Sequence, residues 1–291
     1  MLVDFTLMVQ DEKVEPALYV VASPIGNRGD ITLRALQILD SVDAVAAEDT
    51  RHTRRLLESY GINTPVFSCH ENNEQQRVSL IFERIQGGES VALVTDAGTP
   101  LISDPGYTLV KQLRAQGVPV KTVPGACAVI AALSVAGLPT DRFCFEGFLP
   151  AKAVARKVRL EKLVTEPRTL VFYEAPHRIV DFLDSAAEVF GNLRHMVLGR
   201  ELTKRFETIL EGSIEQLRER ISDDENQQKG EFVVMLEGAK QAQSELSDDA
   251  RKLLQLLCEH LPLKVAASIA AQQFGGNKKD YYKLGLELKS V

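Results

Sequence analysis

Residues 90–106 read SVALVTDAGTPLISDPG, a short apolar run followed by a twelve-residue loop with two aspartates, two glycines and two prolines. A short β-branched run bounded by Asp, Gly and Pro is typical of a buried strand. Gly and Pro in the loop let a ligand approach the backbone closely. We therefore predict a strand here, with a ligand-binding loop after it.

The same pattern repeats on both sides of this stretch, and helical periodicity follows each run. The further strands are predicted at residues 17–23, 42–48, 64–68 and 118–124. Such βα repetition indicates a largely parallel open sheet covered by helices, which we assign to a first α/β domain over residues 17–142. Ligands of such sheets bind beyond the carboxyl ends of the strands.

The pattern changes after residues 143–150 (FCFEGFLP). A basic helical stretch precedes four runs with strand character, which are RTLVFYE, HMVLGRE, FETILEG and EFVVMLEG. Helices are predicted from about Pro176 and over Ile214–Ile221. A mixed sheet explains this order, so residues 143–239 are expected to form a second α/β domain.

The tail, residues 240–291, is predicted to be a linker and a basic helical module. Ser247 is placed to cap the first helix. Three apolar stripes predict three helices: Leu253, Leu256, Leu257 and Leu261; Val265 and Ile269; and Tyr281, Leu284 and Leu288. From Arg251 onward the tail carries +4 in a chain of net charge −6. Helix-turn-helix proportions, with GGNKK as a turn that exposes lysines, favour nucleic acid contact; a helical appendage packed on the body or on a dimer partner is the alternative.

Composition bounds the remaining possibilities. With 45% apolar and 25% charged residues the chain is a globular protein, and its acidic balance excludes binding of nucleic acid by bulk charge. Four cysteines without metal-like spacing favour a reducing, cytoplasmic compartment. Val123–Pro139 is interpreted as a buried helix rather than a membrane span, and residues 1–16 as a loose extension. Dinucleotide, phosphate-loop, zinc-protease and serine-hydrolase motifs are all missing from the sequence.

Eight segments of the chain carry a family resemblance. They are LYVVASPIGN, AAEDTRHT, LVTDAGTPLISDPG, VPGACA, DRFCFEGFLP, FYEAPHR, RELTK and KGEFVVMLEG. In this order they resemble the tetrapyrrole-methylase superfamily of S-adenosylmethionine-dependent methyltransferases. The resemblance implies two α/β domains that hold the methyl donor in the cleft between them, largely through backbone groups, without a metal. It further implies transfer to the ribose 2′-hydroxyl of a cytidine in the decoding region of 16S rRNA, the small ribosomal subunit as partner, and a homodimer.

Matching positions give the expected cofactor-binding residues. They are Pro24, Ile25, Gly26, Asp96, Ala97, Gly98, Leu101, Ser103, Asp104, Ala126, Cys127, Ala128, Tyr173, Arg200, Glu201, Leu202, Gly230 and Glu231. Phosphate contacts to RNA are expected from Lys152, Arg156, Lys157, Arg159, Lys278 and Lys279, with a merely solvated helix face as the alternative for residues 151–162.

Methyl transfer to a ribose hydroxyl also requires a base, because a hydroxyl is a poor nucleophile until its proton is taken or shared. The catalytic candidates are Glu48, Asp49, Arg51, His52, Glu174 and His177, the arginine as an orienting group. A surface ion-pair cluster at a helix start is the alternative for residues 48–55, and a helix cap for His177.

Two other functions stay open. One is methylation of a small tetrapyrrole-like acceptor, which the basic stretch and the basic tail disfavour. The other is a non-catalytic RNA-binding module that retains only the cofactor fold.

Overall fold

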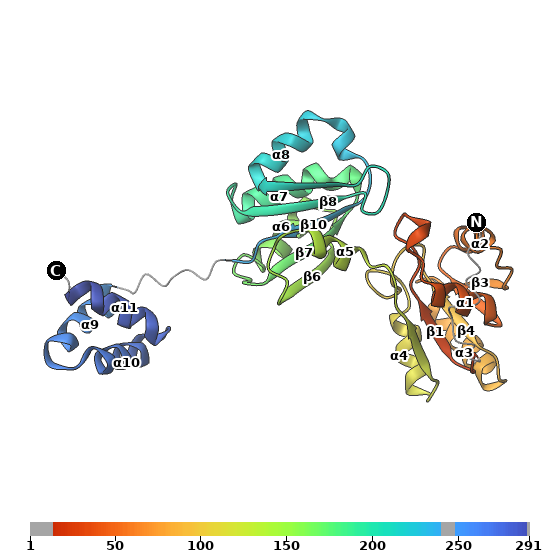
Figure 1. Ribbon diagram of the computed structural model, residues 1–291, viewed down its shortest axis with the longest axis horizontal. Helices are drawn as coiled ribbons and strands as arrows, with labels where there is room; N and C mark the ends of the chain where they lie inside the picture. The colour runs from red at the N-terminus through yellow and green to blue at the C-terminus, as the bar shows by residue number, and fades with distance from the viewer. Residues whose placement is uncertain (1–13, 240–247, 290–291) are drawn as a thin grey trace. The chain divides into compact units, whose positions relative to one another are not determined.

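The computed structural model describes residues 14–239 and 248–289 (Figure 1). They form two compact units, one of residues up to Leu163 with Arg168–Glu237 and the other of Val164–Pro167 with Gly238 onward. The first unit contains two β-sheets and the second contains three helices. The fold class is α/β with a helical module, as predicted; the boundary between residues 142 and 143 stays a prediction.

All five strands of the first sheet were predicted, and all are parallel. They are β1 (Leu18–Val21), β2 (Ala44–Ala47), β3 (Val66–Ser68), β4 (Val91–Val94) and β5 (Val120–Val123), in the order β3-β2-β4-β1-β5. The side chains of the three central strands are buried on both faces, as parallel strands require, whereas the edge strands β3 and β5 are partly exposed.

Helices cover both faces of this sheet. They are α1 (Leu33–Ser41), α2 (Thr50–Glu58), α3 (Glu74–Gln86) and α4 (Tyr107–Ala115), with the short η2 (Arg28–Asp30) before α1. Thr32 caps α1 by accepting a hydrogen bond from the Ala35 amide at 3.1 Å. Helices α1 and α2 pack on the face of Tyr19, and α3 and α4 on the face of Leu18. Because the helices that follow the adjacent strands β1 and β4 lie on opposite faces, the topological switch point lies between these strands.

The second sheet is mixed, as predicted, with only β6 and β7 parallel to each other. Its strands are β6 (Phe143–Phe148), β7 (Thr169–Glu174), β8 (His195–Arg200), β9 (Thr208–Ser213) and β10 (Phe232–Leu236), in the order β6-β7-β10-β8-β9. The edge strand β6 was not assigned from the sequence. One face of the sheet packs against α6 (Ala153–Glu161), α7 (Ile179–Phe190) and α8 (Ile214–Asp223). The short helices η3 (Pro176–Arg178) and η4 (Glu225–Gln228) complete this half.

The other face of the second sheet packs against α5 (Ala128–Val135) and Ile25. This helix was predicted as buried, but only one side of it is: Val129, Ala132 and Leu133 are buried, whereas Ile130 and Val135 are exposed. No helix in the described part of the chain is long and apolar enough to cross a membrane.

The second unit consists of α9 (Asp248–His260), α10 (Leu263–Phe274) and α11 (Lys278–Lys289), which confirms three helices. The third predicted stripe is confirmed, since Tyr281 is buried and Leu284 and Leu288 pack against it, but small side chains rather than Val265 and Ile269 represent α10 in the core. The core residues are Ala250, Leu254, Ala266, Ala267, Ala270 and Tyr281. Alanines let helices approach more closely than branched side chains do, and Leu256, Val265 and Ile269 are left exposed.

The turn between α10 and α11 lies at Gly275–Asn277, and Lys278 and Lys279 after it are exposed, as predicted. The predicted cap Ser247 lies outside the described residues, as do residues 1–13 of the predicted extension. Its last residues are packed rather than loose: Val14 contacts the first core, and the carboxylate of Glu15 pairs with Lys121 Nζ at 2.6 Å.

Candidate active site

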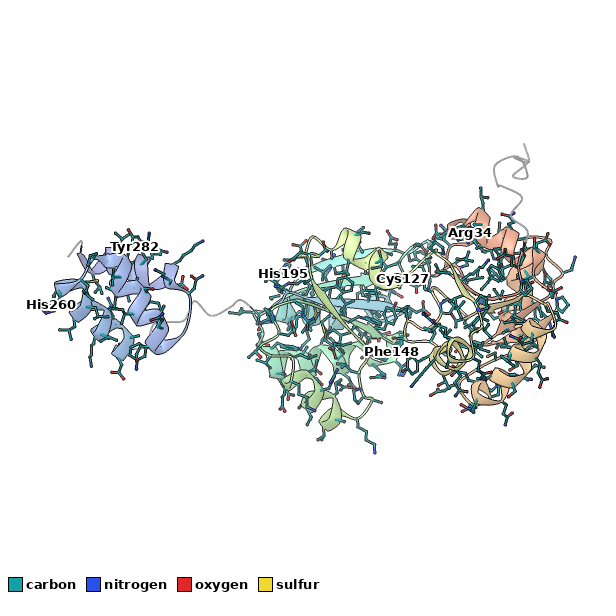
Figure 2. The ribbon with its side chains drawn as sticks, turned by 90° about the horizontal axis from the view of Figure 1, so that it is seen from below. Arg34, Cys127, Phe148, His195, His260 and Tyr282 are labelled. Atoms are coloured by element: carbon teal, nitrogen blue, oxygen red, sulfur yellow. The ribbon has the colours of Figure 1, made fainter. Side chains whose placement is uncertain are left out.

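A cavity of about 310 Å³ lies where the loops after β1, β4 and β5 meet the second sheet. From the first sheet it is lined by Ile25, Ala97, Gly98, Thr99, Ile102, Ser103, Asp104, Cys127 and Ala128. From the second it is lined by Phe148, Tyr173, Glu174, Ala175, Pro176, Leu202, Glu231, Phe232 and Val233. Figure 2 labels Cys127 and Phe148, one from each half. Small-molecule pockets of proteins start at about this size.

Hydrogen bonds tie the three loops of the first sheet together. The Ser23 amide donates to Gly98 O at 2.9 Å, and the Gly98 amide donates back to Ser23 O at 3.2 Å. The Thr99 hydroxyl donates to Ala126 O at 3.0 Å. The loop after β4 is therefore fixed to the loops after β1 and β5, and this wall of the pocket is preformed.

Acidic side chains gather on this wall. Burial, with the nearby charges of Glu48 and Asp96, raises the pKa of Asp104 to about 6, although the Thr95 hydroxyl donates to its carboxylate at 3.1 Å. Burial also raises the pKa of Glu48, whose carboxylate accepts from the Asp96 amide at 3.3 Å. Carboxyl groups that lie close together and are partly buried favour a cationic ligand, because its positive charge offsets their mutual repulsion and their desolvation.

Glu174, the last residue of β7, is among the residues that line this pocket. It is only 1% exposed. Its Oε1 accepts from the Ala175 amide at 2.9 Å and lies 3.2 Å from Arg178 Nε, while its buried Oε2 has no hydrogen-bond partner within residues 14–239 and 248–289. Burial raises the pKa of this carboxyl. A buried carboxylate oxygen without a partner is costly, so it marks a position where a ligand group can bind.

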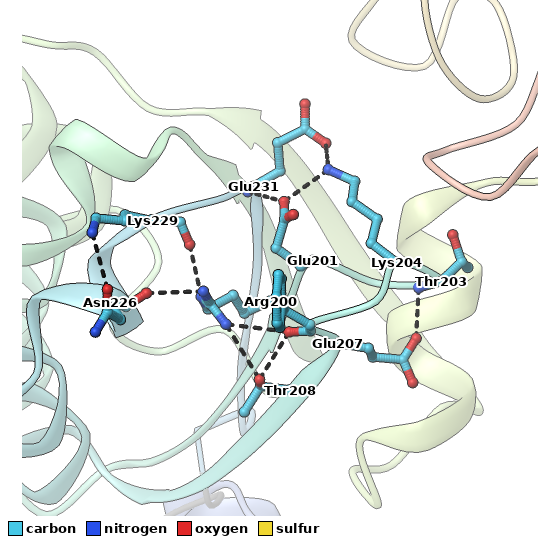
Figure 3. A network of polar contacts seen from close by, with 10 residues as sticks. Arg200, Glu201, Thr203, Lys204, Glu207, Thr208, Asn226, Lys229 and Glu231 are labelled. Carbon is cyan, nitrogen blue, oxygen red and sulfur yellow. Dashed lines mark hydrogen bonds and ion pairs between the residues drawn. The ribbon is translucent and has the colours of Figure 1, made fainter.

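Arg200 holds the second half together rather than lining the pocket. Its guanidinium donates to Lys229 O at 2.7 Å, Asn226 O at 2.8 Å, Phe206 O at 3.2 Å and Thr208 Oγ1 at 3.3 Å (Figure 3). With these bonds made and only 8% of the residue exposed, Arg200 has a structural role in linking the loops of this half. The guanidinium is thus engaged within the protein, and a contact of the Arg200 backbone with the cofactor stays a prediction.

Next to Arg200, Lys204 forms ion pairs with two glutamates, of which Glu231 lines the pocket. Its Nζ donates to Glu201 Oε1 at 2.7 Å and to Glu231 Oε2 at 3.0 Å (Figure 3). Its stem covers Gly26, where a Cβ would lie 2.6 Å from Lys204 Cε, and Gly26 has a φ of +143°. Glycine is thus required at position 26. Lys204 was missed by sequence reasoning, although it stands in the quoted segment RELTK.

The structure brings together ten of the eighteen predicted cofactor residues and one of the six catalytic candidates. Those that line the pocket are Ile25, Ala97, Gly98, Ser103, Asp104, Cys127, Ala128, Tyr173, Glu174, Leu202 and Glu231. The remaining predicted cofactor residues, which do not line it, are Pro24, Gly26, Asp96, Leu101, Ala126, Arg200, Glu201 and Gly230. Thr99 and Ile102 belong to the predicted ligand-binding loop, whereas Phe148, Ala175, Pro176, Phe232 and Val233 were not predicted.

The catalytic candidates at the start of α2 and in η3 do not line the pocket. Asp49 caps α2, accepting from the Arg51 amide at 2.8 Å and the His52 amide at 3.3 Å, and these bonds lower its pKa. The Arg51 guanidinium lies 3.4 Å from the same carboxylate. This is the geometry of a helix cap with a surface ion pair. His177 is exposed in η3.

The basic helix α6 offers fewer free cations than its sequence suggests. Arg156 is 2% exposed and donates to Ser185 Oγ at 2.9 Å and Ala151 O at 3.3 Å, so RNA cannot reach it, contrary to the prediction. Lys157 pairs with Glu188, and Arg159 pairs with Glu146 at 2.5 Å. The exposed Lys152 precedes the helix.

Comparison with known proteins places this site in a family. Residues 17–218 match the family model described as Tetrapyrrole (Corrin/Porphyrin) Methylases, and residues 244–289 match the one described as RsmI C-terminal HTH domain. The chain is 51% identical to ribosomal RNA small subunit methyltransferase I of Escherichia coli O157:H7, covering 93% of this chain and 94% of that protein. It is 52% identical to the protein of the same name from Pseudomonas aeruginosa, covering 93% and 96%.

A solved structure shares the fold. Uroporphyrin-III C-methyltransferase from Thermus thermophilus, complexed with S-adenyl homocysteine, superposes with a TM-score of 0.53 at 18% identity, covering 76% of this chain and 97% of that one. At this level of identity the likeness shows the fold alone.

Proposed function

The chain belongs to the tetrapyrrole methylase family, and on that premise we propose that it methylates RNA of the small ribosomal subunit with S-adenosylmethionine as donor. The acceptor we propose is the ribose 2′-hydroxyl of a cytidine in the decoding region of 16S rRNA. The names of relatives about half identical over nearly the whole chain support the RNA substrate. The observation that carries the chemistry is the pocket, with its buried, unpartnered Glu174 oxygen.

The residues present fit the proposed donor. Ile25, Cys127, Leu202 and Val233 give the pocket apolar walls, and Asp104 and Glu231 add acidic groups at its lining. Apolar walls with a few placed polar groups suit a nucleoside, and carboxylates suit a cation. When bound, S-adenosylmethionine supplies a methyl group on a positively charged sulfur, which makes that methyl electrophilic.

The protein must also manage the proton of the acceptor hydroxyl. We propose Glu174 for this role, because it is a buried carboxylate among the lining residues and its Oε2 has no hydrogen-bond partner within the described ranges. The amide of Ala175 and the guanidinium of Arg178 hold the other oxygen in place. Burial raises the pKa of the carboxyl, which makes its anion a stronger proton acceptor.

Positive charge for the RNA backbone is proposed to come from both units. Lys152, Lys157 and Arg159 follow β6 in the first unit. In the second, Lys278 and Lys279 are exposed at the start of α11, in the segment that matches the helix-turn-helix model. Such contacts position RNA without reading its sequence, and they weaken as salt rises.

Transfer of label from tritiated S-adenosylmethionine separates the candidate functions. We expect label in purified small ribosomal subunits from cells lacking this enzyme, at an alkali-stable cytidine linkage, and little in a tetrapyrrole extract. Label in the extract alone would indicate the small-molecule acceptor. RNA binding without any transfer would indicate the non-catalytic module. The expected homodimer and cytoplasmic location stay predictions, the first checked by light scattering of the purified chain.

A further inference from the structure

Phe148 is an aromatic side chain that the mechanism above does not use. It is the last residue of β6, it lines the pocket, and it is 54% exposed. Its ring lies 5.5 Å from the ring of Tyr173, centroid to centroid, and Phe145 packs edge-on against Tyr173 at 5.0 Å. The exposed part of this ring is therefore available to a ligand at the pocket.

An irregularity in β6 turns this ring toward the pocket. Phe145 pairs with Val171, but the next pairs are Gly147 with Phe172 and Phe148 with Tyr173, so the register shifts by one residue. Side chains alternate between the faces of a sheet. In a regular strand Phe148 would share the face of Cys144, which packs against the helices of the second half. The shift instead puts it on the face of Tyr173, and bulges commonly redirect a side chain in this way beside functional sites.

Gly147 makes the irregularity possible. Its φ is +65°, a conformation that glycine adopts readily and other residues do not. A Cβ at this position would lie 3.0 Å from Ser103 Oγ, in the loop after β4. The edge strand and the pocket loop are therefore packed closely at the residue before Phe148.

The chain beyond Phe148 indicates what its exposed ring meets. Lys152 is exposed four residues later, and the basic helix α6 follows directly. An exposed aromatic ring followed along the chain by an exposed lysine fits the way proteins hold single-stranded nucleic acid, in which bases stack on rings and phosphates pair with lysine or arginine.

We propose that Phe148 is the stacking platform for the base of the acceptor nucleotide. This inference rests on the proposed function and adds how the acceptor is held: the base lies on the Phe148 ring, the backbone runs toward Lys152, and the ribose is presented to the pocket. Stacking needs the flat face of the ring, so an aliphatic side chain of similar bulk cannot replace it.

The test compares Phe148→Ala, Phe148→Leu and Phe148→Trp in the full chain, with tritiated S-adenosylmethionine and purified small subunits. Phe143→Ala is the matched control, because Phe143 is the same residue type, partly exposed, at the opposite end of β6. We expect kcat/KM for the subunits to fall about 5- to 150-fold in Phe148→Ala, the range of one lost base–aromatic contact, and to a similar extent in Phe148→Leu. Phe148→Trp and Phe143→Ala should stay near the wild type, and the affinity for S-adenosylhomocysteine should be unchanged throughout.

The contrary outcomes are distinct. Wild-type activity in Phe148→Leu would show that a ring is not needed and would overturn the inference alone. An equal loss of S-adenosylhomocysteine affinity in Phe148→Ala would assign the ring to the cofactor and also overturn it. Wild-type protein that transfers no label to the subunits would remove the proposed function, and the stacking platform with it.

Discussion

Replacing Asp104 with asparagine should stabilise the protein above pH 6. The pKa of this carboxyl is raised from 3.8 to about 6, chiefly by burial and further by the charges of Glu48 and Asp96. A group whose pKa is higher in the folded state favours folding below its unfolded pKa, and this contribution is lost as the pH rises through the folded pKa. A shift of about two units corresponds to about 3 kcal/mol, and solvent screening of a partly exposed group lowers this to about 1–2 kcal/mol.

Asparagine keeps the shape and can still accept the hydrogen bond of Thr95. We therefore expect Asp104→Asn to raise the unfolding temperature at pH 8 by about 2–8 °C, given about 2–4 °C per kcal/mol for a domain of this size, with little change at pH 4. Differential scanning calorimetry at both pH values measures this. Asp43→Asn is the control of opposite sign, because hydrogen bonds from Ser90 lower the pKa of Asp43 and its loss should destabilise at pH 8. A gain that is absent at pH 8, or as large at pH 4, would refute the reasoning.

Three further changes test other parts of the site. Glu174→Gln should lower kcat about 100-fold or more, as loss of a general base does, while calorimetric titration shows unchanged binding of S-adenosylhomocysteine. Arg200→Lys should lower the free energy of unfolding by about 3 kcal/mol or more in urea titrations, since an ammonium cannot reach all four acceptors of the guanidinium. Replacing Lys278 and Lys279 with glutamine should reduce the salt dependence of RNA binding, the slope of log K against log salt falling by about 1.4 if each contacts one phosphate of single-stranded RNA; an unchanged slope would remove the tail from the RNA interface.

Sequence periodicity predicts those parts of the fold in which the burial of apolar side chains dominates the free energy of folding. The central strands β1, β2 and β4 are buried on both sides, so each is a continuous apolar run, and the βα alternation then leaves one topology class. The position of the pocket followed too, because loops after adjacent parallel strands must meet at one edge. The three tail helices and the buried Tyr281 were also predictable, but the buried face of α10 was not: at Ala266 and Ala270 close helix approach outweighs the hydrophobicity of Val265 and Ile269.

What sequence reasoning missed depends on pairs of residues distant along the chain. Arg156 stands in a basic run, and only its bond to Ser185 shows that it is buried. Phe148 would occupy the helix-packed face of a regular strand, and only the register against β7 shows that it faces the pocket. Neither of these contacts can be inferred from residue type and spacing. The same limit explains why a charged cluster such as that of Asp49 and Arg51 draws attention although its geometry is that of a helix cap.

Residues with strained backbone and partly buried carboxyl groups lie around the candidate active-site pocket. Among the described residues, four other than glycine have positive φ, namely Leu101, Ser103, Glu201 and Thr203. The first two lie in the loop after β4 and the last two in the loop after β8, and each costs about 1–2 kcal/mol relative to ordinary backbone. The hydrogen bonds of Arg200 and the ion pairs of Lys204 hold the loop after β8 in this conformation. The pairing of Ser23 with Gly98 holds the loop after β4. Because Asp104 is a partly buried carboxyl group in the pocket lining, a positively charged ligand would interact favourably with its anion, and binding of S-adenosylmethionine should raise the unfolding temperature.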